Sequence, residues 1–109
     1  MIEIKGGVRV FGLRPEMLLA VQVAEGLWTD HGTPTLVITA VIDGTHKHQS
    51  FHYSGVGVDF RVNTVAPDKR AGLVERFKAA LGPDYVVIHE AIGRAGEHVH
   101  VHFLPAEAY

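Results

Sequence analysis

The stretch EHVHVHFLP, residues 97–105, is the most informative for predicting the fold, because histidine alternates in it with apolar residues. Side chains along a β-strand point alternately to its two faces. One face of this strand would carry His98, His100 and His102, and the other would carry Val99, Val101 and Phe103. The stretch therefore predicts a strand that packs on a hydrophobic core with one face only.

The segments around this strand predict a small sheet. Residues 84–92, DYVVIHEAI, form a second apolar strand, and the glycine-containing turn GRAG joins the two strands in a hairpin. Residues 35–42, TLVITAVI, are β-branched and apolar and predict a largely buried strand. Residues 56–62, VGVDFRV, alternate and predict a further strand after a loop over residues 45–56.

Two segments have the apolar spacing of amphipathic helices. The first covers residues 15–29 and has Pro15 in its first turn, where proline is tolerated. The second covers residues 66–82, with Pro67 near its start and Gly82 as its terminator. The order helix, strand, strand, helix, strand, strand predicts an α+β fold with a small, mainly antiparallel sheet and flanking helices.

Length and charge limit the classes of function. The chain has 109 residues, which is the size of a single domain spanning residues 1–109, and we expect a monomer. Its formal net charge of −2 provides no basic surface for nucleic acid and no polybasic segment for an anionic membrane. The first residues lack the features of a signal peptide, and no apolar run is long enough to span a bilayer. We therefore expect a soluble chain that is made in the cytoplasm.

The absence of cysteine restricts any metal site to imidazole and carboxylate ligands, a donor set that favours zinc. The stretch THKHQSFHYSGVGVDFR, residues 45–61, supplies a second concentration of such groups. His52 and Asp59 can converge if the intervening glycines let the chain turn sharply. A third ligand would come from the histidine row at 98, 100 and 102. A lone histidine is more often a polar residue of a half-exposed sheet, but a row of three histidines weakens that reading.

Two signatures in these segments resemble those of a known family. Residues 50–59, SFHYSGVGVD, are similar to the SxHxxGxAxD signature of the zinc D-alanyl-D-alanine carboxypeptidase family. That family includes vancomycin-resistance dipeptidases, phage L-alanyl-D-glutamate endopeptidases and, by fold, the hedgehog signalling domain. Residues 97–100, EHVH, resemble its second signature, an acidic residue three positions before a histidine. The resemblance covers most of the chain, and short phage members are the most similar.

The resemblance implies a hedgehog-type, DD-peptidase-like fold and a zinc metallopeptidase that hydrolyses a bond of the peptidoglycan stem peptide. The activity would be that of a D-Ala-D-Ala carboxypeptidase or an L-Ala-D-Glu endopeptidase. The implied site has His52, Asp59 and His100 as zinc ligands, Glu97 as the catalytic acid/base and His98 beside the metal.

Two positions depart from the family pattern. Gly57 stands where the family usually has alanine, and His102 stands where short relatives often have an acidic residue. Because His102 shares a strand face with His98 and His100, spacing alone leaves the third zinc ligand open.

The implied chemistry needs no nucleophilic side chain. Zinc lowers the pKa of a bound water to about 7 and polarises the scissile carbonyl. Glu97 would take the proton of that water and pass it to the leaving amine. Positions 97 and 100 of one strand face opposite ways, so this role requires Glu97 to lie in the turn before the strand. His98 would donate a hydrogen bond to the tetrahedral oxyanion, or it is an outer, exposed imidazole.

Three further residues are expected to bind substrate. Arg61 shares the face of Asp59 if residues 57–62 form a strand, and its guanidinium could hold a substrate carboxylate bidentately. A structural ion pair is the alternative for Arg61. Ser50 and Tyr53 would line the cleft by analogy with the family, or they are turn residues. The remaining histidines are interpreted as rim or surface residues (His46 and His48) and as structural residues (His31 and His89).

Two other functions stay open. A non-catalytic zinc-binding domain of the same fold, acting in binding or structure, would keep the metal ligands, although Glu97 argues against it. A small metal-binding β-barrel of the cupin type is suggested by His46 and His48, but it lacks the following glutamate, and two predicted helices flank the strands. A phage origin, with release on lysis, would bring a chain without a signal peptide to the cell wall.

Overall fold

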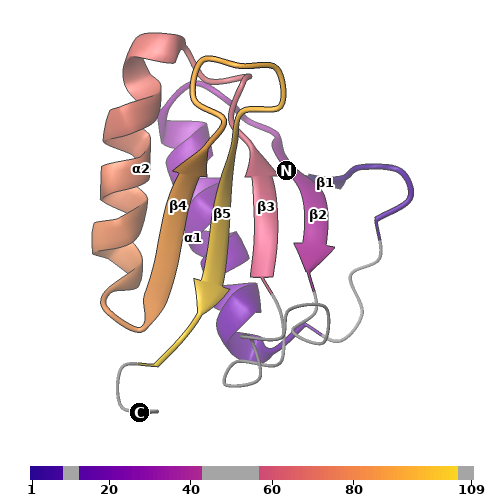
Figure 1. The fold of residues 1–109 in the computed structure, drawn as a ribbon, viewed down its shortest axis with the longest axis vertical. Coiled ribbons are helices and arrows are strands. Elements are labelled where there is room, and N and C mark those ends of the chain that lie inside the picture. The colour runs from indigo at the N-terminus through magenta and orange to yellow at the C-terminus, as the bar shows by residue number, and fades with distance from the viewer. Residues whose placement is uncertain (9–12, 43–56, 106–109) are drawn as a thin grey trace.

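The computed structural model describes residues 1–8, 13–42 and 57–105. These residues form a five-stranded sheet and two helices (Figure 1). The elements are β1 (Ile2–Ile4), α1 (Pro15–Asp30), β2 (Leu36–Ile42), β3 (Gly57–Arg61), α2 (Pro67–Leu81), β4 (Tyr85–Glu90) and β5 (His98–Phe103). The predicted α+β class, both helices and the last hairpin are confirmed. The predicted loop over residues 45–56 lies outside the described residues.

The strand order is β1-β2-β3-β5-β4, so β5 lies inside the sheet although it is the last of the described strands in chain order. β5 pairs antiparallel with β3 and with β4, and β2 pairs antiparallel with β3. The sheet is therefore mainly antiparallel, as predicted. With β1 and β4 at its edges, the described sheet is open and differs from the closed barrel of the cupin alternative.

β1 is the strand that the sequence pattern did not predict. It pairs in parallel with β2 through Ile2, Glu3 and Ile4, and all three residues are exposed. Its sequence Ile-Glu-Ile alternates between apolar and charged residues, but three residues are too few for this pattern to identify a strand. Its pairing partner, beginning at Leu36, is also distant in sequence.

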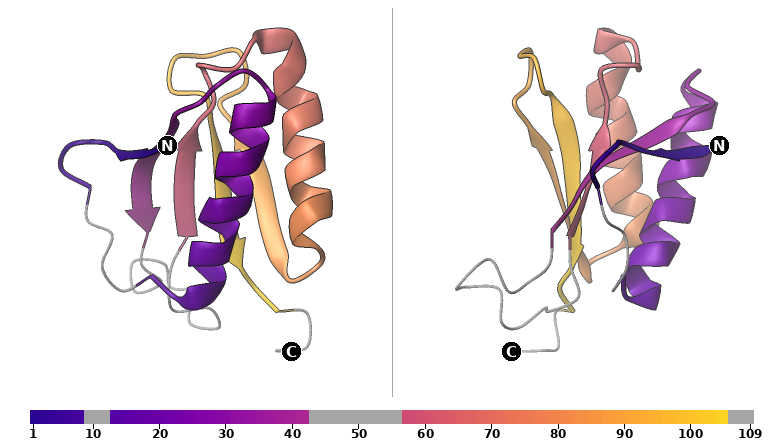
Figure 2. Two further views of the ribbon diagram at one scale, coloured as in Figure 1. Left: turned by 180° about the vertical axis from the view of Figure 1, so that it is seen from behind. Right: turned by 90° about the vertical axis from the view of Figure 1, so that its right-hand side faces the viewer.

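Both helices cover the same face of the sheet, and neither covers the other face (Figure 2). The centre of the core is formed by three aromatic side chains, Trp28, Phe60 and Phe77, each 0% exposed. Their ring centroids lie 5.7 to 6.1 Å apart in tilted or edge-on arrangements. The indole Nε1 of Trp28 donates a hydrogen bond to the carbonyl oxygen of Arg61 at 2.9 Å, which ties α1 to the end of β3.

The alternation predicted for β5 is observed. Val99 and Val101 are fully buried on the helix-covered side, whereas His98, His100 and His102 are partly exposed. The helical stripes are buried in large part, since Met17 and Trp28 of α1 and Leu73 and Phe77 of α2 lie in the core. Leu18 of α1, in contrast, is 51% exposed.

The turn between β4 and β5 is built on left-handed backbone conformations. Gly93 has a φ of 78° and Gly96 a φ of 87°, values that cost glycine little. Ala91 also has a positive φ, of 55°. The turn brings Glu97 to the position directly before β5, which is where the acid/base hypothesis requires it.

Within the described ranges, the structure contains no helix of the length and apolarity needed to cross a membrane.

We expect Phe77→Ala to lower the free energy of unfolding by about 3–5 kcal/mol, because it leaves a cavity beside Trp28 and Phe60. Leu18→Ala is the matched control on an exposed helical site and should change it by less than about 1 kcal/mol. Urea unfolding followed by tryptophan fluorescence measures both. Equal losses for the two variants would contradict this assignment of the core.

Candidate metal centre

The uncovered face of the sheet brings Asp59 of β3 opposite His100 of β5. His100 Nδ1 donates to the Asp59 carboxylate, with a distance of 2.7 Å between Nδ1 and Oδ1. The Nε2 atom of His100 lies 2.8 Å from Nδ1 of His102, and the tautomers of the two rings decide which of these nitrogens donates. The two predicted ligands thus meet directly, and His102 is linked to them.

His98 lies next to this pair and is surrounded by acceptors. Its Nδ1 is 2.8 Å from the carbonyl oxygen of Gly96, and its Nε2 is 3.0 Å from Oε1 of Glu90. The same Nε2 is 3.7 Å from Oδ2 of Asp59. Partial burial lowers the pKa of His98, but the Gly96 carbonyl and the two carboxylates outweigh it and raise the pKa above its ordinary value. The raised pKa makes the His98 imidazole easier to protonate than an ordinary histidine side chain.

The pKa of His102 is shifted in the opposite direction to that of His98. Burial and the neighbouring His100 together lower the pKa of His102 to about 4. At neutral pH its imidazole is uncharged, in agreement with the hydrogen bond that it shares with His100. The row thus contains one histidine that favours the protonated form and one that favours the neutral form.

Gly57, where the family usually has alanine, is fitted to the His100 ring. A Cβ atom at this position would lie 2.6 Å from Cε1 and 3.2 Å from Nε2 of His100. Real Cβ atoms essentially never approach so closely, so alanine would force the imidazole to move. Glycine at position 57 therefore matches the orientation of the His100 ring in this chain.

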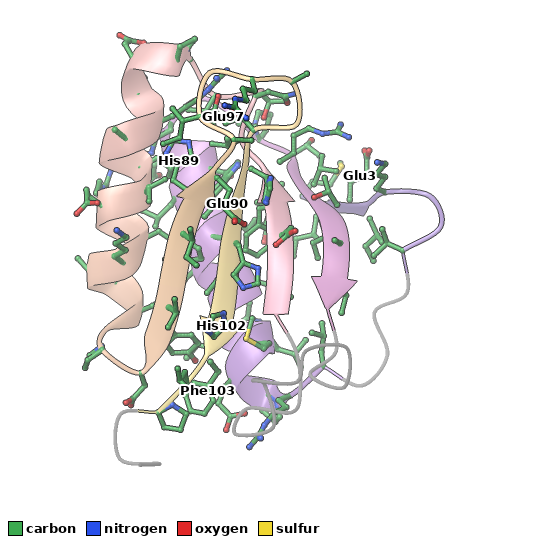
Figure 3. All side chains as sticks on the ribbon, in the orientation of Figure 1. Glu3, His89, Glu90, Glu97, His102 and Phe103 are labelled. Atoms are coloured by element: carbon green, nitrogen blue, oxygen red, sulfur yellow. The ribbon has the colours of Figure 1, made fainter. Side chains whose placement is uncertain are left out.

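Glu97 is buried in a cluster of charged and polar partners. Its Oε1 accepts from Arg70 Nη1 at 2.7 Å and from the Gly93 N–H at 3.2 Å, and its Oε2 lies 2.6 Å from His89 Nε2. The residue is only 4% exposed. Figure 3 shows Glu97 at the hairpin end of β5, with His89 near it on β4 and His102 toward the other end of β5.

This cluster is part of the connection between α2 and the hairpin. Arg70 also donates to the carbonyl oxygens of Val65, at 2.7 Å, and Asn63, at 3.0 Å. Burial raises the pKa of Glu97, but the His89 and Gly93 hydrogen bonds and the Arg70 charge outweigh it and lower the pKa below its ordinary value. Sequence reasoning treated His89 as structural and missed Arg70, because nothing in the pattern of α2 distinguishes this arginine from surface arginines.

A cleft of about 400 Å³ opens beside Asp59. Its lining residues come from the uncovered side of the sheet and from the β4–β5 turn: Lys5, Thr39, Asp59, Arg61, Asn63, Gly96, Glu97 and His98. Four residues named from the sequence therefore border one cavity. Lys5, Thr39 and Asn63 were not named, since no motif includes them.

Three predicted site residues, His52, Ser50 and Tyr53, lie outside the described residues, as do His46 and His48. Within residues 1–8, 13–42 and 57–105, no group of three His, Asp or Glu side chains is arranged to hold a metal ion. Asp59 and His100 are nonetheless donors of the types that zinc takes, and they are in direct contact. The third predicted ligand, His52, lies outside the described residues, so the three-ligand zinc site stays a prediction.

Comparison with known proteins adds nothing to this arrangement. No family model, curated protein or solved structure matches the chain. The function is therefore argued from the residues of the site themselves.

We expect Glu97→Gln to lower the free energy of unfolding by about 3–5 kcal/mol, because it leaves the Arg70 charge partly buried without its counter-charge. Glu75→Gln removes an exposed carboxylate that pairs with Lys78 and should cost less than about 1 kcal/mol. Denaturant unfolding at neutral pH compares the two. A Glu97 variant as stable as the Glu75 variant would show that the cluster contributes little.

Proposed function

We propose that the chain is a zinc-dependent peptidase that hydrolyses a peptide bond of the peptidoglycan stem peptide. The observation that carries the proposal is the 2.7 Å contact between Asp59 and His100 on the uncovered face of the sheet. The two residues come from two separate signatures, and they meet although 41 positions separate them. The cleft beside Asp59 gives a substrate access to the pair.

The proposed zinc ligands are His52, Asp59 and His100. Bound there, zinc would supply an activated water and polarise the scissile carbonyl. The finer fold assignment, hedgehog-type and DD-peptidase-like, belongs to the same proposal. It is supported by a mainly antiparallel sheet that has both helices on one face, with Asp59 and His100 paired across β3 and β5.

His98 is proposed to donate a hydrogen bond to the oxyanion of the tetrahedral intermediate. Its raised pKa favours the protonated ring, and its Nε2 lies 3.7 Å from the Asp59 carboxylate, inside the cleft. Arg61, which lines the same cleft, is proposed to bind substrate. Ser50 and Tyr53 are proposed to do so by family analogy alone.

Glu97 is proposed to be the general acid/base. It borders the cleft, and its lowered pKa keeps it deprotonated and able to accept a proton. In the described conformation its carboxylate is occupied by Arg70 and His89. The role therefore requires the side chain to exchange one of these partners for the water that it deprotonates.

This occupied carboxylate is the observation that favours the alternative function. A non-catalytic zinc-binding domain of the same fold would keep Asp59 and His100 while Glu97 served only the connection to α2. Both functions predict that the chain binds zinc. Only the peptidase predicts turnover of a stem peptide. A phage origin, with release on lysis, is proposed as the route to the cell wall in the catalytic case.

We expect the zinc-reconstituted protein to retain about one zinc per chain, as a three-ligand site requires. His52→Ala and His100→Ala should lose the metal, whereas His102→Ala should keep it and serves as the control within the histidine row. Metal analysis by mass spectrometry after buffer exchange measures the content. A protein without stoichiometric zinc would contradict the site, and loss in His102→Ala alone would reassign the ligand.

We expect Glu97→Gln to lower kcat by about 10²-fold or more with little change in KM, because the amide cannot accept the proton. The substrate is a stem peptide that contains both L-Ala-D-Glu and a D-Ala-D-Ala terminus, so that mass spectrometry of the products identifies the bond. Activity is measured under conditions in which circular dichroism shows the Glu97→Gln variant to be folded. Glu75→Gln serves as the control. Zinc-loaded wild type that cuts neither bond would support the non-catalytic function, and an unchanged Gln variant would exclude Glu97 as the base.

A further inference from the structure

We propose that Lys5 and Arg61 together bind a carboxylate group of the ligand in the cleft beside Asp59. The proposal rests on the proposed function in taking that ligand to be a peptide. Lys5 follows β1 and Arg61 ends β3, so the two cations reach the cleft from different strands. The cavity of about 400 Å³ lies within the range of small-ligand sites.

The acidic and the basic side chains that line the cleft differ in whether they form salt bridges. The Asp59 carboxylate contacts His100 and lies near His98. The Glu97 carboxylate is held by Arg70 and His89. Both acids of the cleft lining therefore have their own partners.

The two cationic side chains of the cleft lining differ from the two acids in this respect. Among the described residues, neither the Lys5 ammonium nor the Arg61 guanidinium takes part in a salt bridge. Lys5 forms backbone hydrogen bonds, from its N–H to the carbonyl oxygen of Ile38 and from the Val8 N–H to its own carbonyl oxygen. The cleft thus presents two positive groups that can receive an anion from a ligand.

The chemistry of the lining favours a carboxylate among anions. A guanidinium fork matches the two oxygens of a carboxylate, and a lysine ammonium adds a point charge. Thr39 and Asn63 line the same cavity and carry groups that can hydrogen-bond to such an anion. Because Asp59 and Glu97 also border the cleft, a singly charged carboxylate meets less repulsion there than a doubly charged phosphate.

Two parts of a stem peptide carry this chemistry, the free C-terminus of D-Ala-D-Ala and the free α-carboxylate of the γ-linked D-glutamate. Either would be held at Lys5 and Arg61, with the adjoining peptide in the cleft that Asp59 and His98 also line. The pair of cations would thus select peptides that carry a carboxylate close to the bond presented to Asp59.

Isothermal titration calorimetry on the full chain in the presence of a chelator tests the proposal without turnover. One probe is acetyl-D-alanyl-D-alanine, compared with its C-terminal amide. The other is acetyl-L-alanyl-D-glutamine, whose free α-carboxylate is compared with the corresponding amide. We expect each acid that binds to lose about tenfold or more in affinity on amidation, as the loss of a charge-assisted hydrogen bond implies.

Lys5→Gln and Arg61→Gln should weaken the binding of the acid by a similar factor and leave the weak binding of the amide unchanged. Lys5→Arg keeps the charge and should restore most of the affinity. The matched controls are Lys69→Gln and Arg76→Gln, which remove the same charges from exposed positions of α2. Circular dichroism checks that each variant is folded.

Equal affinities for acid and amide, or equal losses in the α2 controls, would overturn the proposal. Inorganic phosphate that binds as tightly as the acid would overturn the assignment to a carboxylate. Because binding is measured without zinc, the test is separate from the turnover assay of the proposed function. Carboxylate-dependent binding in a protein that hydrolyses nothing would support this site and count only against the peptidase.

Discussion

The antiparallel register between β3 and β5 is the constraint on which both the core and the site depend. It places Val58 opposite Val101 and Phe60 opposite Val99 on the helix-covered side. The same register places Asp59 opposite His100 on the uncovered side. A slip of one residue would turn imidazoles into the core and valines to the open face. Burial of the apolar residues therefore also fixes which carboxylate meets which histidine.

The ends of this strand pair are held by contacts of two different kinds. At the end of β3, the indole of Trp28 donates to the Arg61 carbonyl, and this contact joins β3 to α1. At the start of β5, the carboxylate of Glu97 binds Arg70 and so joins the hairpin to α2. The second contact uses the side chain that the acid/base hypothesis needs. Stability and proton transfer thus make competing demands on one carboxylate, and its lowered pKa serves the first better than the second.

Much of this arrangement could be read from the sequence, because it follows from local periodicity. The period of two in residues 98–103 and the helical spacing over both helices identify the faces of the elements without any partner. β1 could not be found, since it has three exposed residues and pairs with a strand distant in sequence. The shared side of Asp59 and Arg61 also follows from alternation within β3.

Local periodicity could not identify which residues contact one another across the sheet. The sequence indicated that some histidine of the row would meet Asp59, but the choice of His100 depends on the register with β3. The contact of Glu97 with Arg70 joins residues 27 positions apart and depends on how α2 packs. Lys5 reaches the cleft only because β1 lies beside β2. His52, Ser50 and Tyr53 remain predictions of the sequence.

The position of the last strand also has a consequence for synthesis on the ribosome. β5 is the last of the described strands in chain order, but it lies between β3 and β4. While the chain is being synthesised, β2 and β3 can pair, but the edge of β3 that β5 will occupy stays open until residues 98–103 have emerged. An open strand edge with apolar side chains is the kind of surface on which nascent chains associate wrongly. The protein therefore most needs protection from wrong association between the emergence of β3 and the emergence of β5. Both α2 and the β4–β5 hairpin must be synthesised within this interval.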